Sequence, residues 1–533
     1  MTITELQQRY AAHPNTAVME RLLKDVSVQT IFCGGLCASS ASLFSSVLVK
    51  QDVCPFVFVL GDLEEAGYFY HDLTQILGTE KVLFFPSSFR RSIKYGQKDA
   101  ANEILRTEVL SRLQKGEEGL CIVTYPDALA EKVVSRKELS DKTLKLNVGE
   151  KLDTTFITDV LHSYGFEYVD YVYEPGQYAV RGSIIDVFSF ASEYPYRIDF
   201  FGDEVESIRT FEVESQLSRE KKAGVAIVPD LAVTGEVTTS FLDFIPKETI
   251  LAMRDFLWLR ERIQVVHDEA LTPQAIAVQE AEENGGITLE GKLIDGSEFT
   301  VRALDFRRME FGNKPTGTPD ASITFSTAVQ PIFHKNFDLV AGSFKDYLEQ
   351  GYSLYICSDS TKQTDRIKAI FEDRGDKIQF TPVERTIHEG FVDHTLHLCV
   401  FTDHQLFDRF HKYNLKSDKA RSGKVALSLK ELNQFTPGDY VVHTDHGIGR
   451  FSGLVRIPNG DTTQEVLKLV FQNEDVVFVS IHSLHKVSKY KGKDGEVPRL
   501  NKLGTGAWEK LKDRTKAKIK DIARDLIRLY SQR

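Results

Sequence analysis

Glycine and hydroxyl side chains follow the first strongly apolar run of the chain, where a nucleotide-binding fold places its phosphate loop. Gly34 and Gly35 come directly after residues 29–33, and Ser39 and Ser40 stand a few positions later. A working loop reads G-x-x-x-x-G-K-[ST], because the lysine neutralises the β- and γ-phosphates and the hydroxyl binds Mg²⁺. This stretch lacks that lysine. We therefore expect a degenerate loop, and no ATP, Mg²⁺ or other cofactor in this chain.

Such a loop needs a sheet to hold it, and the first 142 residues predict one. Short apolar runs alternate with stretches of helical periodicity. The expected strands are 29–33, 56–60, 82–85 and 120–124, and the expected helices are 63–77 and 100–113. This alternation is typical of a parallel sheet covered by helices. The sequence thus predicts a degenerate P-loop-type α/β domain.

Two arginines and an aromatic residue form a second group that could do chemistry, in a segment rich in Val, Ile, Phe and Tyr. Turn dipeptides divide this segment into antiparallel strands. In the strand 196–201, alternation sends Arg197 and Phe201 to the face opposite the core, and Arg181 is near in sequence. Arginine beside an aromatic residue is enriched in binding hot spots. The alternative is that Phe201 covers a neighbouring domain and the arginines are solvated or ion-paired.

Residues 435–484 predict a small β-barrel of the SH3 or Tudor type, because short strands are joined by Gly and Asn-Gly turns. In one strand Leu467 and Leu469 share a face, while Lys468 lies on the other face beside apolar neighbours. A strand that is apolar on both faces is either partly covered by another chain or buried on both sides within this protein.

Between and after these units the sequence predicts further elements. Residues 250–268 favour a helix, and a second α/β domain is indicated by a helix at 344–350, a strand at 352–357 and a helix at 360–374. Residues 414–434 have the polar, Gly- and Ser-containing composition of a linker. From residue 481 to the end, 15 Lys and Arg face 6 Asp and Glu, with apolar residues at helical spacing. An amphipathic helix is the first interpretation and phosphate binding the weaker one.

Composition and the amino-terminal sequence favour a cytoplasmic protein without a membrane partner. The chain has 42% hydrophobic and 27% charged residues, and it begins without the basic and apolar segments of a signal peptide. Its six cysteines stand mostly in apolar runs and form no CxxC pair, which indicates reduced core residues and no metal site.

Two stretches carry a resemblance to a known family. EPGQYAVRGSIIDVF followed by PYRIDFFGDEVESIRTF resembles the module shared by the excision-repair protein UvrB and the transcription-repair coupling factors, the Mfd family. GDYVVHTDHGIGRFSGL resembles the RNA polymerase interacting domain of the same family, which is shared with CarD-type regulators. The first resemblance implies docking on UvrA through Arg181, Arg197 and Phe201. The second implies an exposed edge strand that pairs with the polymerase β subunit, at Leu467, Lys468 and Leu469.

The resemblance also implies an order of domains in an α/β multidomain chain. The expected units are a degenerate UvrB-like nucleotide-binding fold (1–142 and 231–330), an inserted UvrA-binding module (143–230), a second α/β domain of unknown role (331–413), the linker (414–434), the barrel (435–500) and a basic helix (501–533). No Walker lysine or Mg²⁺-binding acidic motif was found in the sequence. The ATP-dependent motor, with its ATP, Mg²⁺ and most of its DNA contacts, is therefore expected outside this chain.

The function that this resemblance implies is a non-catalytic adaptor of transcription-coupled nucleotide excision repair, which recruits UvrA to RNA polymerase stalled at DNA damage. One alternative is a UvrB-like nucleotide-dependent helicase or excision subunit, against which the degenerate loop argues. UvrB's damage-probing hairpin also has little room here, although Arg90, Arg91 and Lys94 remain candidates for a phosphate contact. The other alternative is a stand-alone CarD-like regulator.

Overall fold

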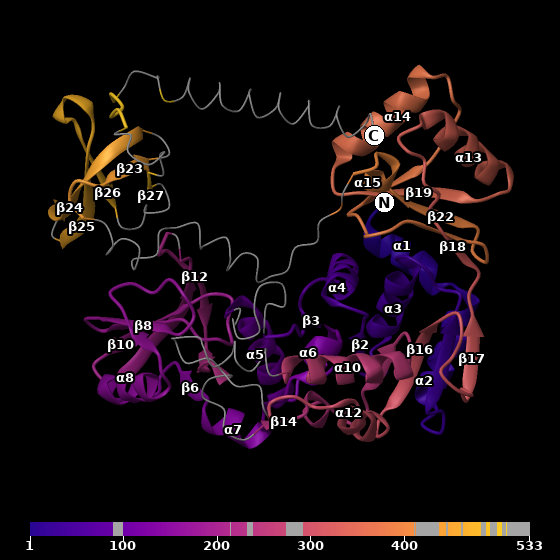
Figure 1. The fold of residues 1–533 in the computed structure, drawn as a ribbon, viewed down its shortest axis with the longest axis horizontal. Coiled ribbons are helices and arrows are strands. Elements are labelled where there is room, and N and C mark those ends of the chain that lie inside the picture. Colours follow the sequence, from indigo (N-terminus) through magenta and orange to yellow (C-terminus); the bar gives the residue numbers. More distant parts are fainter. Residues whose placement is uncertain are drawn as a thin grey trace.

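A seven-stranded sheet forms the centre of the first domain (Figure 1). The structure, a computed structural model, describes residues 1–88, 100–213, 215–231, 238–272, 291–409, 411, 436–443, 446–459, 462–480, 487–490, 498–503 and 508. The strand order is β17-β1-β16-β15-β2-β4-β3, and every neighbouring pair is parallel. The strands are β1 (Thr30–Gly34), β2 (Phe56–Val59), β3 (Val82–Phe84), β4 (Cys121–Thr124), β15 (Ile250–Met253), β16 (Arg307–Gly312) and β17 (Ala321–Thr324). The predicted parallel sheet is confirmed.

Helices cover this sheet and begin where the sequence offers caps. The Asp62 side chain accepts a hydrogen bond from the Glu65 N–H at the start of α4, and Gly78 follows its end. The helices of this domain are α1 (Ile3–Ala11), α2 (Pro14–Lys24), α3 (Ser40–Gln51), α4 (Leu63–Leu77), α5 (Ala100–Gln114), α6 (Pro126–Ala130), α7 (Arg136–Asp141), α10 (Phe256–Ala270) and α12 (Gly296–Ala303). The helix predicted at 250–268 is wrong at its start, because four consecutive apolar residues there form the buried strand β15.

The β-rich module is inserted between the two parts of the first domain. Its six strands have the order β12-β11-β10-β9-β8-β7. They are β7 (Glu167–Tyr168), β8 (Gln177–Arg181), β9 (Ile184–Val187), β10 (Tyr196–Phe201), β11 (Glu204–Phe211) and β12 (Ser218–Lys222). Helix α8 (Thr154–Ser163) buries Ile157 and Leu161 in one core with Ile198 of β10. One face of the sheet is therefore covered by α8. Short strand pairs complete the region: β6 (Leu144–Asn147) with β13 (Gly224–Ile227), and β5 (Val133–Val134) with β14 (Thr238–Thr239).

The second α/β domain has a five-stranded mixed sheet of order β18-β21-β22-β19-β20. Its elements are β18 (Thr327–Val329), α13 (Phe337–Glu349), β19 (Ser353–Ser358), α14 (Thr361–Asp373), β20 (Thr381–Glu384), β21 (Phe391–Asp393), β22 (Leu398–Thr402) and α15 (Asp403–Leu406). Figure 1 shows this domain beside α1, α3 and α4 of the first domain. Residue Thr2, just before α1, forms a bridge to Glu384 of β20, so the two domains meet along the chain's first residues.

The terminal sheet is antiparallel and has the order β26-β25-β24-β23-β27. Its strands are β23 (Tyr440–His443), β24 (Gly447–Asn459), β25 (Thr462–Val470), β26 (Val476–Ser480) and β27 (Val487–Lys489). Five antiparallel strands agree with the prediction, while the SH3 or Tudor identity stays a prediction. The predicted linker, nearly all of the predicted terminal helix, and Arg90, Arg91 and Lys94 lie outside the described residues. Within the described ranges, no helix is long and apolar enough to cross a membrane.

Candidate functional site

The degenerate loop lies at the carboxyl end of β1, and neighbouring backbone covers it. Gly35 has a φ of +84°, and a Cβ atom at this position would lie 2.0 Å from the Phe325 carbonyl oxygen. Only glycine fits this close approach. The backbone of Phe325, the residue after β17, therefore lies against Gly35, where a bound phosphate would need space.

The second α/β domain uses the hydroxyl groups of this loop. Ser39 donates its N–H to the Glu389 carbonyl (3.3 Å), and Glu389 donates its N–H to Ser39 Oγ (2.9 Å). Ser42 Oγ donates to Asp72 (2.7 Å), which also accepts the His388 N–H (2.7 Å). Ser39 and Ser40 are 3% and 0% exposed. The groups that sequence reasoning assigned to a degenerate phosphate site are buried in a joint between two domains.

The charge of this joint is also wrong for a phosphate. Burial raises the pKa of Asp72 to about 6, against the lowering effect of its hydrogen bonds from Ser39, Ser42 and His388. At neutral pH the carboxyl is still mainly ionised, so the serines of this loop lie beside a negative charge, whereas a phosphate site needs a positive one.

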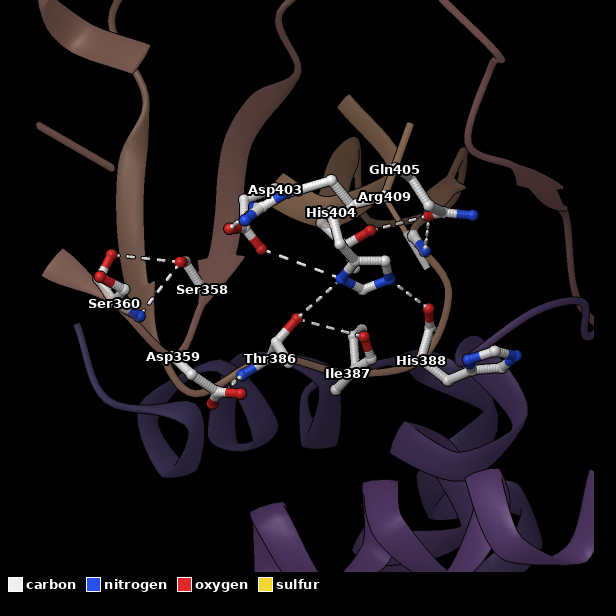
Figure 2. Close-up of polar contacts among 12 residues, drawn as sticks. Ser358, Asp359, Ser360, Thr386, Ile387, His388, Asp403, His404, Gln405 and Arg409 are labelled. Carbon is white, nitrogen blue, oxygen red and sulfur yellow. Dashed lines mark hydrogen bonds and ion pairs between the residues drawn. The ribbon is translucent and has the colours of Figure 1, made fainter. Parts of the chain in front are cut away.

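A cluster of histidines completes the joint. His71 of α4 lies 5.2 Å (ring centroids) from His411, which lies 4.5 Å from His404. Tyr68 stacks on His388 at 3.4 Å. Figure 2 shows His404 between Thr386, Asp403 and the His388 carbonyl, at the carboxyl ends of β19 and β22. Burial lowers the pKa values of His71, His388 and His404 to about 4, so these imidazoles are neutral at pH 7.

Sequence reasoning missed this joint because its partners come from residues 37–72 and 386–411, which no local pattern connects. In the described part of the chain, no group of three or more His, Cys, Asp or Glu residues is arranged to hold a metal ion.

The predicted UvrA-docking arginines share one buried carboxylate. Asp186 of β9 is fully buried, and Arg197 donates to it through Nε (2.8 Å) and Nη2 (2.9 Å). Arg181 of β8 pairs with the same carboxylate. The structure therefore brings Arg181 and Arg197 together. Sequence reasoning missed Asp186, although an aspartate inside a buried strand requires such a partner.

Phe201 lies at the far end of β10 from Arg197, next to the Gly202 turn, and is 80% exposed. The alternative interpretation is thus right for the arginines, which are ion-paired, and wrong for Phe201, which covers no neighbouring domain in the described part of the chain. Its exposed ring lies on the face opposite α8. We call the face formed by Arg181, Asp186, Arg197 and Phe201 the arginine face.

The three residues matched to the polymerase contact do not form an exposed edge. Leu467 and Leu469 are 1% and 0% exposed and pack in the core of the terminal sheet with Phe451, whereas Lys468 is half-buried. Their strand β25 is paired on both sides, with β24 and β26. The prediction that Leu467 lies on an edge strand is therefore wrong. Burial within this protein is the correct alternative, because inward residues of a core strand show the same alternation as contact residues.

The edge strands of this sheet are β26 and β27, and an open stretch also lies on β24, beyond its pairing with β23. Pairing with β23 covers residues 447–450, and the last hydrogen bonds on that side join Phe451 to Gly438 and Asp439. A bulge follows, in which Gly453 has a φ of +115°. In the described part of the chain, no strand pairs with residues 454–459 on that side, and Leu454 is 41% exposed.

Comparisons with known proteins match the β-rich module and the terminal sheet to two domain families. Residues 144–232 match the UvrB interaction domain, and residues 435–491 match the CarD-like/TRCF RID domain. The chain is 24% identical over 94% of its length to a transcription-repair-coupling factor of Bacillus subtilis strain 168. It is 24% identical, over the same share, to a protein of that name from Staphylococcus aureus strain RF122, and 23% identical to one from strain USA300.

The chain spans 48% of the length of each of these relatives. Both resemblances drawn from the sequence are confirmed by the family matches, at 144–232 and at 435–491. The chain is accordingly similar to the transcription-repair-coupling factors over 94% of its length, and two of its segments match the UvrB interaction domain and the CarD-like/TRCF RID domain.

Proposed function

We propose that this chain is an adaptor of transcription-coupled DNA repair, which joins UvrA to RNA polymerase. The observation that carries the proposal is the presence of two protein-interaction families on separate folded units of one chain. An enzyme subunit does not need both interaction units in one chain, whereas an adaptor does. The relatives' name supports the same role.

UvrA is the proposed partner of the arginine face. Two guanidinium groups share the single Asp186 carboxylate, so the group carries a net charge of +1. Arginine held rigidly on the same face as an exposed aromatic ring is typical of an interface hot spot. Phe201 is 80% exposed, and a partner that covers its ring would remove this apolar surface from water.

RNA polymerase is the proposed partner of the terminal sheet. The open stretch of β24, residues 454–459, offers backbone donors and acceptors that pair with no second strand among the described residues, and a strand of the polymerase β subunit would extend the sheet there. Leu454 replaces Leu467 as the residue that we assign to this contact, because it is half-exposed and lies beside the open edge.

We further propose that the chain itself is non-catalytic. The degenerate loop is covered by backbone and hydrogen-bonded to the second α/β domain, and the Asp72 carboxylate lies beside its serines. These contacts weigh against the UvrB-like helicase alternative. DNA would then be handled by a motor outside this chain.

One pair of variants tests the adaptor proposal. Arg197→Glu should weaken binding of purified UvrA by at least ~2 kcal/mol and leave polymerase binding unchanged. Leu454→Arg should do the reverse. If either substitution changes neither affinity while the fold is retained, the surface assigned to that partner is wrong.

A further inference from the structure

The terminal sheet touches the β-rich module through an aromatic side chain of that module. Tyr171 belongs to the segment between β7 and β8, and it packs against the core of the terminal sheet, which includes Phe451 and Leu467. In Figure 1 the terminal sheet accordingly lies next to the module, above β8 and β12. The contact joins the two units that carry the proposed UvrA and polymerase surfaces.

The segment that presents Tyr171 is fixed by the module's own core. Val172, the next residue, is fully buried and packs in one cluster with Phe211 of β11. The carbonyl of Val172 accepts a hydrogen bond from the Gln216 side chain (3.2 Å). With Val172 held inside the module, Tyr171 is held at its surface, where it is half-buried.

Arg181 connects Tyr171 to the arginine face. Its guanidinium carbon lies 5.0 Å from the centre of the Tyr171 ring, within the range of a cation–π contact. The same guanidinium pairs with Asp186. Arg197 reaches the same segment by a second route, because its guanidinium lies 4.5 Å from the centre of the Phe211 ring. The ring that touches the terminal sheet is therefore a direct neighbour of the arginine face.

The size of a protein interface determines whether UvrA and the terminal sheet can be bound here together. A stable interface covers about 800 Å² on each partner, which as a circle has a radius of about 16 Å. Phe201 lies about 13 Å beyond Arg197 along β10, so a patch of that size includes the whole arginine face. Tyr171, which is 5.0 Å from Arg181, falls within the same patch. UvrA on the arginine face and the terminal sheet on Tyr171 would therefore overlap.

We propose that the free chain holds its terminal sheet on Tyr171, beside the arginine face, and that UvrA displaces this sheet when it binds Arg181. The proposal rests on the proposed function and adds a form of regulation to its UvrA surface. The docked sheet lowers the apparent affinity for UvrA, because only molecules with the sheet undocked are competent to bind. By thermodynamic linkage, UvrA binding in turn favours release of the sheet from the module.

Photo-cross-linking of the full chain tests the docked state and its displacement. Tyr171→p-benzoylphenylalanine introduces a photoreactive ring, which should cross-link to a peptide of the terminal sheet that mass spectrometry identifies. Saturating purified UvrA should remove this cross-link, and it should no longer do so when Arg197→Glu is added. Tyr168→p-benzoylphenylalanine is the matched control. Tyr168 is 59% exposed in the same module, but its ring lies against Tyr178 in the core under α8, so no cross-link to the terminal sheet is expected.

Titration calorimetry with purified UvrA measures the effect of the docked sheet on affinity. Tyr171→Ala should strengthen UvrA binding by about tenfold, because it removes a partly buried aromatic contact from the docked state only. Tyr171→Phe keeps the ring and its contact with Arg181, so its affinity should stay within about threefold of the unmodified chain. Tyr168→Ala should change nothing. Thermal melting checks that each variant keeps its fold.

The outcomes separate this proposal from the proposed function. If position 171 does not cross-link to the terminal sheet, or position 168 does so equally well, the docked state is refuted. If the cross-link persists in saturating UvrA, or Tyr171→Ala fails to strengthen binding, displacement is refuted and the adaptor role stands. If UvrA does not bind the unmodified chain, the UvrA assignment fails and displacement fails with it, although the cross-link in the free chain still forms.

Discussion

Ser39 and Glu389 bind each other reciprocally, each donating its backbone N–H to an oxygen of the other. They are 350 residues apart in the chain. Through this pair the loop that would hold a phosphate in a nucleotide-binding fold holds the second α/β domain. The degenerate loop has thus become a joint between domains.

We expect no ATP hydrolysis by this chain, with or without DNA. The physical reason is that the loop lacks its lysine, its serines are buried, and Asp72 places a carboxylate beside them. A steady-state ATPase assay checks this. DNA-stimulated turnover above ~0.1 per second would contradict the expectation, since enzymes typically turn over at 1 per second or faster.

We expect the joint between the two α/β domains to weaken as the pH falls from about 6.5 towards 4. His71, His388 and His404 have pKa values of about 4 in the joint, because burial disfavours the charged form, against 6.5 for free histidine. In that window the opened state binds more protons, so the free energy holding the joint closed falls with decreasing pH.

The other charged groups of the joint do not reverse this sign. Asp359 and Asp403 oppose the shift of His411 but leave its pKa lowered, and Arg409 adds a like charge near His404. Asp72, beside Glu389, acts in the opposite direction because its pKa is raised, but it is one carboxyl against three imidazoles. Hydrogen exchange at α4 and residues 386–390, corrected for the intrinsic effect of pH, should lose protection at pH 4.5. Protection equal to that at pH 7.5 would show that the histidines do not control the joint.

Asp186→Asn should destabilise the β-rich module by about 2 kcal/mol. The substitution leaves two guanidinium groups without their carboxylate, and the cost stays below that of a fully buried pair because the Arg181 side chain is 33% exposed. Urea unfolding of the full chain, followed by hydrogen exchange in β8–β11, measures the effect. Asp199→Asn is the control, since its pair with Arg209 is partly exposed and should contribute under ~1 kcal/mol. Equal effects of the two substitutions would contradict the central role of Asp186.

Leu467→Arg should unfold the terminal sheet, because it buries an unpaired charge in the core around Phe451. Polymerase binding is lost with the fold, while UvrA binding persists because the arginine face belongs to another module. Lys468→Glu, at a half-buried position, should leave the sheet folded. A folded terminal sheet in the Leu467→Arg protein would show that Leu467 is not buried in the core.

The sequence was sufficient to predict elements whose signal is local. The first sheet follows from short apolar runs, and α4 was predicted with its observed bounds, 63–77, from periodicity alone. The run 250–253 misled the helix prediction because a fully buried parallel strand and the first turn of a helix are both apolar.

What could not be predicted depends on contacts between distant segments. The outward face of β10 is visible from alternation, yet the Asp186 carboxylate that joins its arginine to β8 belongs to another strand. The burial of Leu467 depends on strand order, which alternation does not reveal. The histidine joint depends on how two domains dock, which no single segment encodes.

Assembly of a three-component complex tests the adaptor claim most directly. Purified UvrA, this chain and RNA polymerase core enzyme would be mixed and separated by size-exclusion chromatography, each pair being run alongside. We expect one peak containing all three proteins, which loses only UvrA with Arg197→Glu and only polymerase with Leu454→Arg. Two mutually exclusive binary complexes, or UvrA and polymerase eluting together without this chain, would contradict it.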